Sequence, residues 1–212
     1  MHWIEEAGLI AVVRLPDLSR AVRLAESLAD GGVRLLEFTY TNREAGTAIA
    51  EARRALGDRC RVGAGTVLDA ETARQAILAG AEFIVTPTLR RETIELCRRY
   101  AVPSVIGAFS PTEILTAWES GADYVKVFPA SVAGPRYFRD VLGPLPQVKL
   151  IPTGGVTIET APRFLQNGAA AVAVGGHLID AAAVEGGDWA GIQRRAAEWV
   201  RLVDEARGMV GQ

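Results

Sequence analysis

Two charged residues lie inside otherwise apolar segments, and both have side chains suited to catalysis. Lys126 lies in the run YVKVFPA, and Glu37 lies in VRLLEFTY. Burial in an apolar strand disfavours the ammonium form and lowers the pKa of a lysine, so Lys126 is expected to present a neutral amine. Such an amine can attack a ketone and form a protonated imine, which accepts the electrons of a breaking carbon–carbon bond. The same pattern also fits a structural lysine whose ammonium reaches water.

Glu37 is the natural partner of this amine. A carboxylate in a partly desolvated cavity has a raised pKa and can move protons between water, a carbinolamine and an enamine carbon. We expect Glu37 to pair with Lys126 across the interior of the fold. The alternative is a structural ion pair with Arg14 or Arg34.

Two glycine pairs predict an anion site. Gly154 and Gly155 follow one apolar run, and Gly175 and Gly176 follow the next, with His177 beside them. Backbone N–H groups in such turns can bind phosphate, and His177 can add a proton donor or a positive charge. Glycine pairs also serve as plain tight turns, and a lone histidine is often a surface group.

Smaller side chains complete the candidate site. The Thr66 hydroxyl can donate to a substrate carboxylate, and Pro87 with Phe128 can form an apolar wall against a methyl or methylene group. Arg14 and Thr153 are further candidates, because each follows directly on an apolar run.

Short runs rich in Val, Ile and Leu recur about every 20 to 25 residues, and stretches with helical spacing of apolar residues separate them. The first helix is expected to begin near Asp17 and to stop at Gly31, and a last amphipathic helix is expected over 186–208. The eight strand candidates are 9–14, 34–39, 60–66, 82–87, 103–107, 123–129, 148–155 and 171–176.

Strands apolar on both faces and joined by helices form a parallel sheet covered by helices, and eight such units predict a closed (β/α)8 barrel. We expect residues 1–212 to form one domain of this kind, with the last helix at its bottom or side. An open doubly wound sheet is the rival, but its GxGxxG fingerprint is absent. In a barrel, the carboxyl ends of the strands form the active face, where all the candidate residues lie.

Composition excludes several classes of function. The formal net charge is -2 with acids and bases interspersed, so nucleic acid is not an expected partner. No apolar run approaches the roughly 20 residues that span a bilayer, and the first residues lack a basic targeting region. Cys60 and Cys97 lack metal-ligand spacing. We expect a cytoplasmic protein that binds neither membrane nor metal and needs no cofactor.

With these motifs in order, the chain resembles the 2-keto-3-deoxy-6-phosphogluconate (KDPG) and 2-keto-4-hydroxyglutarate (KHG) aldolases, which are class I lyases. The resemblance covers almost the whole chain. Its carriers are IAVVR (10–14), LEFTYT (36–41), GAGTV (63–67), FIVTP (83–87), SPTEI (110–114), KVFPA (126–130), PTGGV (152–156) and VGG (174–176).

The resemblance implies a role for each candidate residue. Lys126 forms the imine, Glu37 is the general acid and base, and Thr66 with Arg14 binds the keto acid. Members of this family usually form trimers without a metal, and the KDPG branch serves the Entner–Doudoroff pathway. Pro87 and Phe128 line the pyruvate pocket, while Thr153, Gly154, Gly155, Gly175 and Gly176 hold the phosphate.

The chain departs from the family pattern at two positions. Many members carry LEVTLRT, in which an arginine holds the substrate carboxylate, whereas this chain has Thr41 there. Arg43 or Arg14 can compensate only if the fold places its guanidinium suitably. His177 stands where a serine is common, so it either binds phosphate or marks a different tail group.

The expected reaction is the cleavage of KDPG, a small keto acid phosphate, to pyruvate and glyceraldehyde 3-phosphate. The phosphogalactonate epimer and the unphosphorylated hydroxyglutarate are alternatives, because the stereochemistry at C4 depends on hydroxyl contacts. Outside this class, the chain would be a noncovalent sugar-phosphate isomerase or binding barrel with a structural Lys126.

Overall fold

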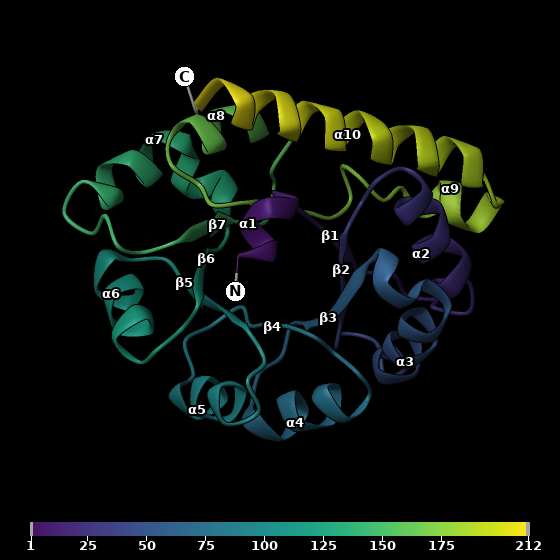
Figure 1. Cartoon of the computed structure of the whole chain (residues 1–212), viewed down its shortest axis with the longest axis horizontal. Coiled ribbons are helices and arrows are strands. Elements are labelled where there is room, and N and C mark those ends of the chain that lie inside the picture. Colours follow the sequence, from purple (N-terminus) through teal and green to yellow (C-terminus); the bar gives the residue numbers. More distant parts are fainter. Residues whose placement is uncertain (1, 211–212) are drawn as a thin grey trace.

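The computed structural model describes residues 2–210, with the side chains of Met209 and Val210 left out. Within this range, eight parallel strands pair in the order β7-β6-β5-β4-β3-β2-β1-β8, and a bridge between Thr153 and Ala173 joins the outer two. The prediction of a (β/α)8 barrel is confirmed (Figure 1). Met1, Gly211 and Gln212, which the predicted domain includes, lie outside the described residues. The strands are β1 (Leu9–Val13), β2 (Leu35–Thr39), β3 (Arg61–Gly65), β4 (Ile84–Val85), β5 (Ser104–Ala108), β6 (Tyr124–Val127), β7 (Leu150–Pro152) and β8 (Val172–Val174).

Helices surround the strands on the outside, and local side chains fix where several of them begin (Figure 1). Asp69 accepts a hydrogen bond from the Thr72 N–H at the start of α4, and Ser110 with Glu113 forms a capping box at the start of α6. The outer helices are α2 (Ala21–Asp30), α3 (Ala45–Leu56), α4 (Ala70–Leu78), α5 (Arg91–Arg99), α6 (Pro111–Glu119), α7 (Ala130–Leu142) and α8 (Ala161–Gln166), with a 3-10 turn at Gly57–Arg59.

The helix ends differ from the predictions in two places. The first outer helix begins at Ala21 and not near Asp17, because Asp17 accepts hydrogen bonds from the N–H and hydroxyl of Ser19 and forms a local turn. The helix predicted over 186–208 is confirmed as α10, which begins slightly later, at Trp189 (Trp189–Val210). A short helix that the sequence did not predict, α9 (Ala181–Gly186), precedes it, and Gly187 with a left-handed φ of 71° separates the two. Helix α10 lies along the side of the barrel against α2 and α8 (Figure 1).

A short helix that the sequence did not predict covers the amino-terminal end of the barrel. Helix α1 (Trp3–Ala7) lies over the centre of the ring of strands (Figure 1). Its five residues are too few to show a helical period, and a helix this short depends on tertiary contacts. Ile4 is buried against the barrel interior, and the Trp3 ring meets the Phe83 ring edge-on at 5.9 Å.

Side chains alternate along the strands between two apolar layers. One layer packs between the strands and the outer helices. The other fills the barrel with residues two positions apart, such as Ile10 and Val12 on β1. Because Tyr124 also belongs to the interior layer, the same alternation directs Lys126 inward.

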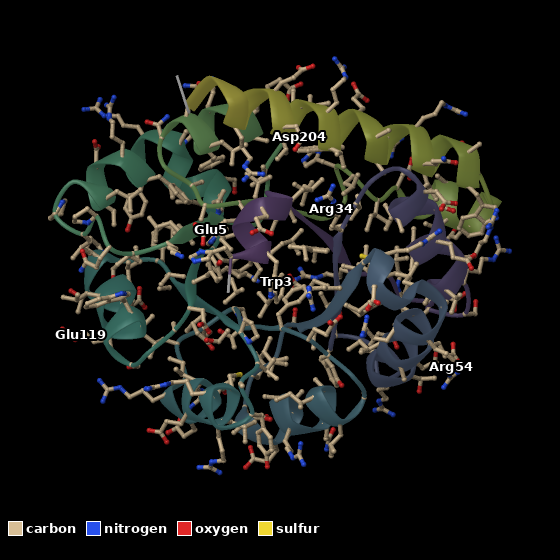
Figure 2. The ribbon with its side chains drawn as sticks, in the orientation of Figure 1. Trp3, Glu5, Arg34, Arg54, Glu119 and Asp204 are labelled. Carbon is tan, nitrogen blue, oxygen red and sulfur yellow. The ribbon has the colours of Figure 1, made fainter. Side chains whose placement is uncertain are left out.

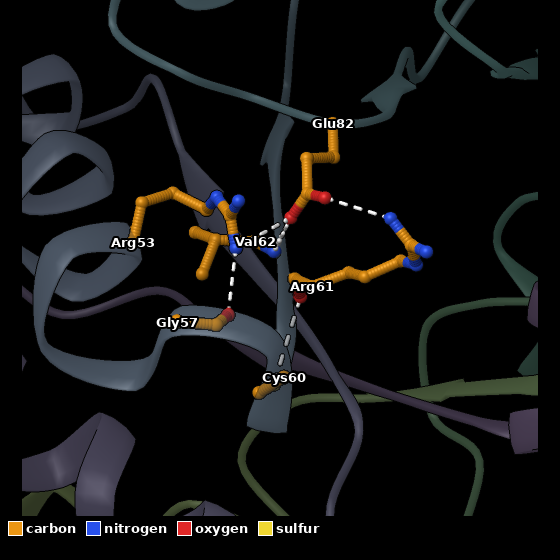
Figure 3. A network of polar contacts seen from close by, with 6 residues as sticks. All are labelled: Arg53, Gly57, Cys60, Arg61, Val62 and Glu82. Carbon is orange, nitrogen blue, oxygen red and sulfur yellow. Dashed lines mark hydrogen bonds and ion pairs between the residues drawn. The ribbon is translucent and has the colours of Figure 1, made fainter.

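Acidic side chains anchor the amino ends of neighbouring strands. Glu82, just before β4, accepts hydrogen bonds from the Arg61 guanidinium at 2.8 Å and the Val62 N–H at 3.2 Å, and it pairs with Arg53 of α3 at 3.0 Å (Figure 3). These contacts hold the two-residue strand β4 against β3 and α3. Among residues 2–210, no helix combines the length and the apolar character that crossing a bilayer requires.

Replacing Glu82 by Ala tests this anchor. We expect the free energy of unfolding to fall by about 1–3 kcal/mol, because the Val62 N–H loses its acceptor and two guanidinium groups lose their partner. Urea denaturation measures the change. The matched control is Glu95→Ala on the exposed face of α5, which should cost less than about 0.5 kcal/mol. Equal losses in the two variants would contradict the anchoring role.

Candidate active site

Lys126 and Glu37 both project into the barrel interior and are almost completely buried, with exposed fractions of 1% and 0%. Glycines on neighbouring strands provide the space. A Cβ on Gly65 would lie 1.7 Å from Glu37 Oε1, and a Cβ on Gly107 would lie 2.1 Å from the Pro87 carbonyl carbon. Gly107 pairs directly with Lys126 in the sheet. Gly65 therefore leaves the space that the Glu37 carboxylate occupies, whereas Gly107 lets the backbone at Pro87 pass close to β5.

Burial dominates the electrostatics of both groups. It lowers the pKa of Lys126, Arg14 adds to that effect, and Glu37 opposes it. Burial also raises the pKa of Glu37, while Lys126 and Arg14 act in the opposite direction. Both groups are thus biased toward their neutral forms, which for Lys126 is the nucleophilic amine.

Glu37 and Lys126 interact electrostatically, as the pairing predicted, but they form no direct ion pair among the described residues. Within the described part of the chain, neither carboxylate oxygen of Glu37 has a hydrogen-bond partner. The alternative ion pair of Glu37 with Arg14 or Arg34 is likewise absent from these residues. The orphaned carboxylate faces the interior that Lys126 shares, so both groups are poised to act on a third molecule.

A cavity of about 230 Å³ opens at the carboxyl ends of β1, β6, β7 and β8. The Phe128 ring forms part of its wall, and the ring centroid lies 5.1 Å from Lys126 Nζ. Thr153 also lines it, and the buried Thr153 hydroxyl has no hydrogen-bond partner among residues 2–210. The full lining is Val12, Arg14, Phe128, Thr153, Gly154, Gly155, Val156, Ala173, Gly175, Gly176 and His177.

The two glycine turns present backbone donors to this cavity. Gly155 has a left-handed φ of 74°, and a Cβ there would lie 2.6 Å from the Ser131 Cβ, so the close turn needs glycine. The N–H groups of Gly155, Gly176 and His177 find no acceptor within residues 2–210. Together with the His177 side chain, they make this end of the cavity suitable for an anion.

Arg14 stands between this cavity and a larger one of about 670 Å³, which Thr41 and Arg43 also line. Its Nη2 donates to the Thr66 hydroxyl at 3.5 Å. Thr66 has a φ of 56°, a left-handed conformation that is strained for a β-branched residue and is typical of functional sites. Thr41 has a neutral side chain, and its hydroxyl lies 2.9 Å from the Thr39 hydroxyl.

The structure thus brings most of the predicted residues together. Lys126 and Glu37 lie in the barrel, and Thr66 reaches the cavity through Arg14. Lys126, Glu37, Thr66 and Pro87 are not part of the lining of the 230 Å³ cavity, and the Pro87 backbone lies close to Gly107. Sequence analysis missed the role of Gly65, although the alternation of GAG with the neighbouring strand is a signal that could have found it. Within the described residues, no group of His, Cys, Asp or Glu side chains could hold a metal ion.

Comparisons with known proteins agree with this arrangement. A family model for KDPG and KHG aldolase matches residues 2–195. A 2-dehydro-3-deoxy-phosphogluconate aldolase of Treponema pallidum (strain Nichols) is 33% identical over 201 residues, which cover 94% of this chain and 95% of that protein. A solved structure of native KDPGal is 30% identical, with a TM-score of 0.89, and the match covers 97% of this chain and 98% of that one. The KDPG aldolase from Legionella pneumophila, with pyruvate captured at low pH as a covalent carbinolamine intermediate, is 28% identical, with a TM-score of 0.85 and coverage of 92% and 94%.

The raised pKa of Glu37 predicts how stability depends on pH. As the pH rises above the ordinary value of 4.5, the unfolded chain releases this proton before the folded chain does, so the wild type loses stability. The Glu37→Gln variant does not lose stability in this way, because glutamine has no proton to release. Its free energy of unfolding relative to the wild type should therefore increase as the pH rises above 4.5, by about 1.4 kcal/mol for each unit of pH until the folded chain also releases the proton.

Urea denaturation across this pH range measures the difference. Glu51→Gln, at an exposed position of α3, is the matched control and should follow the wild-type curve. A Glu37→Gln curve parallel to that control would mean that the buried carboxyl has an ordinary pKa.

Proposed function

Because the chain belongs to the KDPG and KHG aldolase family and is thus an aldehyde-lyase, we propose that it cleaves KDPG to pyruvate and glyceraldehyde 3-phosphate through an imine on Lys126. The observation that carries the proposal is the burial of Lys126 beneath the cavity, which favours the neutral amine. The pyruvate carbinolamine in the Legionella pneumophila relative supports covalent chemistry of this kind.

Lys126 Nζ attacks the C2 ketone and forms a carbinolamine. Glu37 in its protonated form donates a proton to the carbinolamine hydroxyl, which leaves as water and gives a protonated imine. Glu37, now ionised, accepts the proton of the C4 hydroxyl as the C3–C4 bond breaks. The electron pair of that bond moves into the enamine, and the aldehyde leaves. Protonation of the enamine at C3 and hydrolysis of the imine release pyruvate and restore the amine.

The cavity supports the binding roles. Arg14 and Thr66 are placed to bind the keto acid carboxylate beside Phe128, whose ring covers the methylene carbon. Pro87 lies two residues after β4, and we propose that it contributes to the wall of the pyruvate pocket. Thr153 offers its unpartnered hydroxyl to a substrate hydroxyl. The phosphate binds at the backbone donors of the turns Gly154–Gly155 and Gly175–Gly176, with His177 beside it.

The phosphogalactonate epimer is a second candidate substrate, which the similarity to native KDPGal supports. The two epimers differ at C4, where the Thr153 hydroxyl and the Glu37 carboxylate are the polar groups at hand. The single domain over residues 1–212, the trimer and the cytoplasmic location remain predictions of the sequence.

Borohydride trapping tests the imine. After incubation with pyruvate and sodium borohydride, peptide mass spectrometry should find a reduced adduct on Lys126. Lys126→Met should keep the fold and lose adduct and cleavage together, because no other group forms the imine. The matched control is Lys149→Arg, which changes the other lysine of the chain and should still form the adduct. Cleavage by Lys126→Met at the wild-type rate would overturn the proposal in favour of noncovalent chemistry.

His177→Ala tests the phosphate end. We expect KM for KDPG to rise by about tenfold with kcat little changed, because a hydrogen bond to a charged group is lost while the reacting atoms are untouched. KM for unphosphorylated hydroxyglutarate should not change. Steady-state cleavage assays with both substrates provide the comparison, and an equal effect on the two would exclude a phosphate contact at His177.

A further inference from the structure

The amino-terminal helix α1 closes the barrel directly beneath the candidate site. Trp3 lies near the centre of the ring of strands, and Glu5 lies on the side of α1 that faces β6 and β7 (Figure 2). Tyr124, 2% exposed, lies two residues before Lys126 on the inner face of β6 and belongs to the same interior layer as Ile4. The apolar layer between solvent and Lys126 at this end of the barrel therefore includes α1 itself.

A polar latch fastens α1 to the strands. Glu5 Oε1 accepts a hydrogen bond from Lys149 Nζ at 2.6 Å and from the Tyr124 hydroxyl at 3.0 Å. Lys149 Nζ also lies 5.5 Å from the centroid of the Tyr124 ring. One carboxylate thus joins α1 to β6 and to the residue before β7. Because α1 has only five residues, its position depends on such contacts.

Lysine is rare in this chain, and both lysines lie at this part of the barrel. The sequence contains two lysines among 23 basic residues, and the other basic residues are arginines. One lysine is the candidate nucleophile, and the other fastens the helix beneath it. Arginine keeps its charge at almost any pH, whereas the charge of a lysine depends on hydration.

We propose that α1 is a plug that positions the amine of Lys126 for reaction, because the latch of Glu5 to Tyr124 and Lys149 keeps water out of the barrel below it. This inference rests on the proposed role of Lys126 as nucleophile. Glu37 on β2 and Arg14 just after β1 are the charged groups that act on Lys126 from the other strands, and neither contacts α1 through a hydrogen bond or ion pair among the described residues. Opening the plug hydrates the amine from below and favours its ammonium form.

The two glutamates of α1 provide a matched test. Glu5→Ala breaks the latch, whereas Glu6→Ala removes the same charge from the next residue, whose side chain is exposed and whose hydrogen bond to Arg207 uses the backbone carbonyl. Because the chain has two lysines, selective 13C labelling of lysine gives a Cε signal for each, and a pH titration by NMR follows Lys126 directly. The wild-type midpoint should lie below the ordinary value of about 10.4.

In Glu5→Ala, the Lys126 midpoint should rise by about half a unit or more, whereas in Glu6→Ala it should stay at the wild-type value. The direction is decisive, because the loss of a negative charge alone would lower the midpoint. The rate of imine formation with pyruvate below the midpoint should fall about threefold for each half unit and recover at higher pH. Glu5→Gln keeps an acceptor for Tyr124 and should shift the midpoint less, so it carries the test if Glu5→Ala is poorly folded.

An unchanged or lowered midpoint in Glu5→Ala and Glu5→Gln would overturn the plug. Equal shifts in Glu5→Ala and Glu6→Ala would overturn it as well. The titration uses no pyruvate, so it separates the two proposals: a raised midpoint in Glu5→Ala together with no borohydride adduct in the wild type would remove the proposed function and the plug's role in the reaction, and would leave only the exclusion of water by α1.

Discussion

The exclusion of water from one lysine and one carboxylate is the constraint on which the rest of this structure depends. Moving either charge out of water is costly, and the protein reduces that cost by biasing both groups toward their neutral forms. Such a pair cannot sit in a solvated cleft. It needs a closed wall of strands, an apolar layer beneath and a narrow opening above, which the barrel supplies.

The two ends of the barrel therefore differ in chemistry. At the amino end, acidic side chains bind strand amides and basic groups: Glu82 links β3, β4 and α3, and Asp123 accepts from the Ser104 N–H at 2.9 Å. At the carboxyl end, glycines leave backbone donors facing a cavity. Rigid pairing at one end holds the strands in register, so the loops at the other end are free to carry binding groups.

Two positions make this chain distinct within its family pattern. Thr41 stands where an arginine is common, and its hydroxyl lies beside Thr39, whereas the guanidinium that lines the cavity at the carboxyl end belongs to Arg14. His177 brings an imidazole to the turn that offers backbone donors to an anion. Both changes lie at the rim and leave the Lys126 and Glu37 interior unaltered. The rim thus differs from the family pattern while the buried pair of charged residues fits it.

The sequence by itself determined the eight strands, the parallel barrel and the identity of the two buried charged groups, because strand alternation and apolar runs are local patterns. It also identified the glycine turns and His177. Only the tertiary structure decided that Glu37 has no hydrogen-bond or ion-pair partner within residues 2–210 and that its carboxylate lies against Gly65 of the neighbouring strand, because both depend on how the strands come together. The same holds for the close approach of the Pro87 backbone to Gly107, which no local pattern predicts. Helix α1 was missed because five residues show no periodicity, and its place under Lys126 arises from contacts with residues more than 100 positions away, Tyr124 and Lys149.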